Sequence, residues 1–251
     1  MKKYVALLAA AGLMAAATAA FGASIVNSKH DLSNGSLVGG NASAYTMGSS
    51  TQICIYCHAP HYALESLPLW NRTNPSGAGF TLYSGLNMEN VSFKTGLTSD
   101  STSLFCMSCH DGVTGIQAVF NAGVIDGNTS DKNHGFAAGT FTRGGGTGGA
   151  LAGANSGNLT KDLSKTHPIN FVVAETNTQT DLWPGTGPEM SGSTYGTKFP
   201  LFKSTHANAD RTTANRSLEC GSCHAVHDSA YQPFLRDTMG KSRLCLGCHN
   251  K

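Results

Sequence analysis

The chain has 251 residues, of which only 13% are charged, and it contains 30 glycines and eight cysteines. So many glycines make long helices and strands costly in backbone entropy, which argues against an ordinary aliphatic core. The formal charge is +2, and no lysine or arginine cluster of the kind that binds nucleic acid occurs, so a nucleic-acid partner is excluded.

The N-terminus predicts a secretory signal peptide. Lys2 and Lys3 precede an apolar run rich in alanine and leucine, and small residues follow it. We expect residues 1–23 to be removed and residues 24–251 to form an exported protein with no remaining membrane attachment. A retained membrane anchor is the alternative, because the apolar run is nearly long enough to cross a bilayer. Loss of Lys2 and Lys3 would leave 15 basic residues against 15 acidic ones.

All eight cysteines lie in four copies of the pattern Cys-x-x-Cys-His. Two thiols at this spacing can form thioethers with the two vinyl groups of one haem, and the adjacent histidine can bind the iron. Zinc sites and redox disulfides also use Cys-x-x-Cys pairs, but they do not require a histidine directly after every pair. We therefore predict four covalently attached haem c groups, which would also form much of the core. The residues are Cys54, Cys57 and His58; Cys106, Cys109 and His110; Cys220, Cys223 and His224; and Cys245, Cys248 and His249.

The motifs repeat in an order that divides the chain into two dihaem halves, approximately 24–120 and 160–251, joined by a Gly/Ser/Thr-rich segment. Motifs one and three continue as CIYCHAPH and CGSCHAVH, and each is followed by a proline-containing segment, PLWNR at 68–72 and PFLR at 233–236. A histidine beside Asp-Leu-Ser precedes each of them, in KHDLS at 29–33 and KDLSKTH at 161–167. We predict a single tetrahaem domain built from these halves.

This repeat selects four histidines as the second axial ligands: His30, His61, His167 and His227. His134 and His206 have no counterpart in the other half, and we interpret them as solvated loop residues. Methionine is the alternative ligand. Met107 is poorly placed between two haem cysteines, however, and none of Met47, Met88, Met190 and Met239 recurs in both halves. Bis-histidine iron is therefore preferred, and a filled iron argues against catalysis at the metal.

The position of His61 relative to His58 restricts its role. Residues three positions apart lie on the same side of a helical turn, so His61 cannot reach the opposite face of the haem that His58 binds. His61 should therefore serve a different haem, and the same reasoning applies to His227. The spacing does not identify which haem either histidine serves.

Several segments together resemble the OmcE-type tetrahaem outer-surface cytochromes. They are SKHDLS (28–33), CIYCHAPH with PLWNR, TLYS (81–84), LFCMSCHDG (104–112), THPINF (166–171), CGSCHAVHD and the terminal LCLGCHNK. The resemblance implies a multihaem cytochrome c fold, mostly coil with short helices around the Cys-x-x-Cys-His motifs and little or no sheet. It also implies bis-histidine haems, assembly into extracellular filaments, and one axial histidine donated by a neighbouring subunit, for which His61 is the candidate.

These inferences favour an exported electron conduit rather than an enzyme. The expected protein self-associates head-to-tail into filaments at the outer cell surface and exchanges electrons with other redox proteins or extracellular acceptors. A soluble periplasmic shuttle, with every axial ligand supplied within the chain, is the alternative. A multihaem oxidoreductase would need an open iron, whereas all four motifs end in histidine and enough further histidines exist to fill every site.

Overall fold

The computed structural model describes residues 25–33, 53–59, 63, 68–83, 96–115, 119–120, 157–173, 182–183, 185–186, 189–190, 192, 196–202 and 216–251. All four Cys-x-x-Cys-His motifs lie within these ranges. The predicted signal peptide, most of the glycine-rich middle segment, and the histidines His61, His134 and His206 lie outside them.

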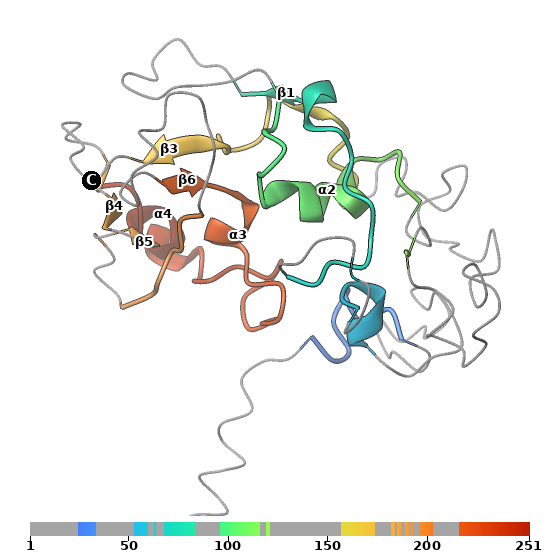
Figure 1. Cartoon of the computed structure of the whole chain (residues 1–251). Helices are drawn as coiled ribbons and strands as arrows, with labels where there is room; N and C mark the ends of the chain where they lie inside the picture. The colour runs from blue at the N-terminus through green and yellow to red at the C-terminus, as the bar shows by residue number, and fades with distance from the viewer. Residues whose placement is uncertain are drawn as a thin grey trace, which may run out of the picture.

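Each motif begins on, or overlaps, a short helix (Figure 1). Motif one starts with the 3-10 helix η3, Cys54–Tyr56, and motif two lies in the longest of the described helices, α2, Ser103–His110. Motif three forms α3, Cys220–Cys223, and motif four overlaps α4, Arg243–Leu246. Two further 3-10 helices are η4, Gly77–Gly79, and η7, Gly240–Ser242. The helices end within one or two turns, as the glycine-rich composition predicts.

The described strands are two or three residues long and form three two-stranded sheets. β1 (Thr81–Leu82) pairs in parallel with β2 (Asp162–Leu163), and β3 (Phe171–Val173) pairs antiparallel with β6 (Arg216–Leu218). β4 (Gly185–Thr186) and β5 (Glu189–Met190) form the third, antiparallel pair. The expectation of mostly coil with short helices agrees with this structure. Little or no sheet was expected, whereas the described residues form three short two-stranded sheets. Buried loop backbone needs hydrogen-bond partners, and these short strand pairs provide some of them.

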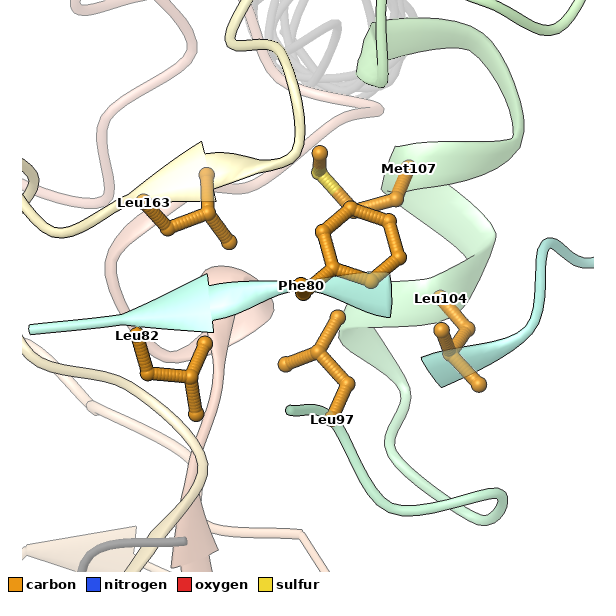
Figure 2. Close-up of a cluster of buried hydrophobic side chains, with 6 residues drawn as sticks. All are labelled: Phe80, Leu82, Leu97, Leu104, Met107 and Leu163. Atoms are coloured by element: carbon orange, nitrogen blue, oxygen red, sulfur yellow. The ribbon is translucent and has the colours of Figure 1, made fainter. Parts of the chain in front are cut away.

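Two small apolar clusters hold these elements together. Figure 2 shows the first, in which α2 packs against β1 and β2 through Phe80, Leu82, Leu97, Leu104, Met107 and Leu163. The second surrounds the β3–β6 pair and contains Phe171, Val173, Met190, Phe199, Leu201 and Leu218. Because β2 joins the first cluster, the segment that opens the second predicted half packs on the first half.

The described residues contain no helix that is long and apolar enough to cross a membrane.

Candidate haem-attachment sites

The histidine that closes each of the first three motifs is oriented by a backbone carbonyl. The Nδ1 atoms of His58, His110 and His224 lie 2.7, 2.6 and 2.9 Å from the carbonyl oxygens of Pro68, Gly157 and Pro233. A carbonyl can only accept, so Nδ1 carries the proton in each ring. This tautomer leaves the lone pair on Nε2, which is the arrangement that metal-binding histidines adopt.

The two long motifs share a hairpin that holds this carbonyl in place. In the first, Ala59 N–H donates to the Leu69 carbonyl and the Asn71 N–H to the Cys57 carbonyl. In the second, Ala225 N–H donates to Phe234 and Arg236 N–H to Cys223 in the same way. The hairpins turn at Leu69 and Phe234, whose φ angles of 62° and 59° are both in the left-handed region.

This hairpin corrects the alignment of PLWNR with PFLR. The backbone hydrogen bonds place Asn71, not Arg72, at the position in the first hairpin that Arg236 occupies in the second: Asn71 N–H donates to Cys57 and Arg236 N–H to Cys223. Both side chains donate to the carbonyl that follows the first motif cysteine: Asn71 Nδ2 to Ile55 at 2.8 Å and Arg236 Nε to Gly221 at 2.8 Å. The sequence comparison missed this role because it matched the two arginines by identity.

Three of the four motif histidines face a second imidazole. The ring centroids are 6.0 Å apart for His110 and His30, 6.0 Å for His58 and His227, and 6.3 Å for His249 and His167. Two imidazoles that bind one metal ion from opposite sides, each through a nitrogen about 2 Å from it, have centroids roughly 6 to 6.5 Å apart. The three pairs therefore have the spacing that a six-coordinate iron requires.

The described residues contain no second imidazole that pairs in this way with His224. Its ring interacts electrostatically with His30 and His110, yet His30 already faces His110 at the spacing given above. His30, His167 and His227 are thus each brought to a motif histidine. His61, the remaining predicted ligand, lies outside the described residues.

The fourth attachment site has a cavity beside it. This cavity has a volume of about 260 Å³, slightly below the range of roughly 300 to 1,000 Å³ that is common for ligand sites. Cys248, His249 and His167 line it, and its walls are mostly apolar: Tyr83, Pro168, Phe171, Val173, Leu182, Met190 and Leu218. An apolar slot with an attachment thiol and two imidazoles suits a haem. Of the candidate methionines, Met190 lines this slot, Met107 is buried in the first cluster and Met239 is exposed.

Burial favours the neutral forms of one predicted ligand histidine and of three attachment cysteines. It lowers the pKa of His30 from 6.5 to about 4, with smaller contributions from nearby histidines. A neutral imidazole is the form that binds a metal. Burial also raises the pKa of Cys57 to about 12, of Cys223 to about 11 and of Cys248 to about 12. All three cysteines are half-buried.

The thiols of successive motifs lie next to one another. Cys57 of motif one interacts with Cys109 of motif two, and Cys106 of motif two hydrogen-bonds with Cys220 of motif three. Cys223 of motif three interacts with Cys245 and Cys248 of motif four. The attachment sites therefore form a row in the order one, two, three, four. Among the described residues, no group of three or more Cys, His, Asp or Glu side chains is arranged to hold a bare metal ion.

Comparison with protein-family models gives one match. Residues 213–251, which contain motifs three and four, match the family described as "Doubled CXXCH motif". The comparison with curated proteins gives no match. The doubled motif and the geometry above agree in indicating covalently bound haem of the kind found in c-type cytochromes, and electron transfer is the activity that this motif indicates.

Proposed function

We propose that this chain is an exported tetrahaem cytochrome that carries electrons along head-to-tail filaments of its own copies, to redox partners or acceptors outside the cell. Each iron would be held between two histidines. Haem supplies a one-electron couple between ferric and ferrous iron when it is bound. The chain's own residues attach it, ligate it and keep water away from it.

The ring pairs support a specific ligand set. His110 with His30, His58 with His227, and His249 with His167 would each enclose one iron, since all three pairs have the required spacing. The second pair joins motif one to the residue that follows motif three.

The observation that carries the filament proposal is the difference between His224 and the other three motif histidines. Its ring is oriented by Pro233 like that of His58 by Pro68, but no described imidazole faces it at ligand distance. His61 is the one predicted ligand left to fill this position. We infer that His61 of one copy binds the iron at His224 of the next, which would make a contact that does not close on itself.

Replacement of His61 by alanine in the full chain tests this assignment. We expect four covalent haems, loss of filaments, and one haem per subunit without its second histidine. Negative-stain microscopy reports assembly, and electron paramagnetic resonance reports the spin state of each haem. His134→Ala is the matched control and should assemble normally.

Two results would contradict the proposal. Normal filaments from His61→Ala would show that His61 is not the link between copies. A wild-type protein that is monomeric with four low-spin haems would instead favour the periplasmic shuttle, in which His61 serves His224 of its own chain.

A further inference from the structure

A buried carboxylate lies at the middle of the row of attachment sites. Glu219 directly precedes Cys220, and only 1% of its surface is exposed. Its Oε2 accepts hydrogen bonds from Ser101 Oγ at 2.6 Å and Ser103 Oγ at 2.5 Å, and its Oε1 accepts one from Ser217 Oγ at 2.5 Å. The side chain also accepts the N–H of Ser222 in a capping box at the start of α3.

Two serine hydroxyl groups are oriented to donate to Glu219. Ser101 Oγ accepts the N–H of Ser103, and Ser103 Oγ accepts the N–H of Cys220, so the hydroxyl proton of each serine is directed at Glu219. Glu219 has no ion pair within the part of the chain that the structure describes.

Glu219 adjoins the thiols of two different motifs. The Cys106 and Cys220 thiols hydrogen-bond with each other, and the charge of Glu219 acts on both of them. Ser103, which donates to the carboxylate, also accepts the N–H of Cys220 and lies one turn before Cys106 in α2. The negative charge therefore sits at the junction between attachment sites two and three.

Two arginines lie beside other attachment thiols. Arg72 is 1% exposed, acts on the Cys57 thiol and donates to the carbonyl of Ser108 at 3.3 Å, within motif two. Arg236 acts on the Cys223 thiol and donates to Gly221 within motif three. Arginine remains charged at all accessible pH values. Arg72 thus lies between motifs one and two, whereas both of these contacts of Arg236 are with motif three.

We propose that Glu219 lowers the reduction potentials of the haems at motifs two and three, so that these inner haems have lower potentials than the outer ones. The inference rests on the proposed function in that it requires haem at all four motifs. A nearby anion stabilises ferric iron relative to ferrous iron and so lowers the potential. Glu219 acts on thiols of motifs two and three, and its donor Ser103 contacts the backbone of motif three.

The test is a potentiometric titration of the fully loaded Glu219→Gln protein, followed by visible absorption. Glutamine keeps the shape of the side chain and removes its charge. We expect two of the four midpoints to rise by about 59 mV, which is a tenfold higher ratio of reduced to oxidised haem for a one-electron couple. The other two midpoints should move by much less.

Two controls separate electrostatics from structure. Asp162→Asn removes one negative charge from an exposed position on β2 and should leave all four midpoints unchanged, because solvent screens that charge. Ser101→Ala removes one bond to Glu219 but keeps its charge, so it should lower the unfolding midpoint with little effect on the potentials. Equal midpoints in Glu219→Gln and Asp162→Asn would overturn the proposal.

A measurement on the wild-type protein keeps the proposal testable if Glu219→Gln does not fold. Haem-resolved potentials, from the shifted methyl resonances of the ferric haems, should be lower for haems two and three than for haems one and four. An inner haem with the highest potential would overturn the proposal. Haem content by mass spectrometry distinguishes failure of this inference from failure of the proposed function. A protein that carries four haems, but whose inner haems do not have the lower potentials, would refute only the role of Glu219.

Discussion

The two long-motif regions, residues 53–72 and 220–237, have the same local construction but different surroundings. In both, a hairpin places a proline carbonyl on Nδ1 of the motif histidine, and a side chain at the hairpin's end donates to the carbonyl within the motif. His58 nevertheless faces the ring of His227, whereas no imidazole of a described residue faces His224 at that spacing. The hairpin thus orients the first ligand, and the second ligand is determined by contacts elsewhere.

Among the changes that test the difference between the two long-motif regions, His227→Ala should have the largest effect. The change should make the first region resemble the second, because His58 would lose the ring that lies 6.0 Å away. Isolated subunits should gain one further haem that lacks a second histidine, seen as a new high-spin signal in electron paramagnetic resonance. His206→Ala, at a predicted loop histidine, should leave the spectrum unchanged. An unaltered spectrum in His227→Ala would mean that another group binds the iron at His58.

A smaller difference should separate the two hairpin turns. Phe234 is 5% exposed and stacks on His30 with ring centroids 4.4 Å apart, whereas Leu69 is 44% exposed. We expect Phe234→Ala to lower the free energy of unfolding by about 3 to 5 kcal/mol and Leu69→Ala by less than about 1 kcal/mol. Guanidinium unfolding of the loaded proteins, followed by far-ultraviolet circular dichroism, measures both. Similar losses in the two variants would indicate that the turns are packed alike.

The smallest expected difference concerns the side chains that end the hairpins. Asn71 is 1% exposed, so Asn71→Ala would leave the Ile55 carbonyl buried without that donor, at a cost of about 1 to 3 kcal/mol. Arg236 is half-buried, and water can replace its bond to Gly221 more easily. Arg236→Ala should therefore cost less, about 1 kcal/mol, in the same unfolding measurement. The opposite order would show that Arg236, and not Asn71, is the stronger support.

Local covalent chemistry is the part of this protein that its sequence predicts best. Two cysteines and a histidine within five residues are sufficient for attachment, so the four motifs could be recognised without knowledge of the fold. The helices around them and the coil between them also follow from local composition. The short strands could not be predicted, because two or three residues do not establish a period of two.

Long-range partners are what the local pattern cannot specify. Motif repetition selected His30, His167 and His227, but it did not indicate that they face His110, His249 and His58. Matching by residue identity aligned Arg72 with Arg236, whereas the backbone hydrogen bonds show that Asn71 is the residue equivalent to Arg236. The sequence did not predict a role for Glu219, because its serine donors, Ser101 and Ser103, are far away in the sequence. The only local signal was the capping-box spacing between Glu219 and Ser222.

The pairing of His58 with His227 has a consequence for the timing of maturation. A chain that emerges N-terminus first presents Cys54 and Cys57 early, but His227 appears only when most of the polypeptide has already passed. Until then, His58 would lack the imidazole that faces it in the folded chain. Formation of this pair would therefore be one of the last events in synthesis, and truncation anywhere before residue 227 would leave His58 without its facing ring.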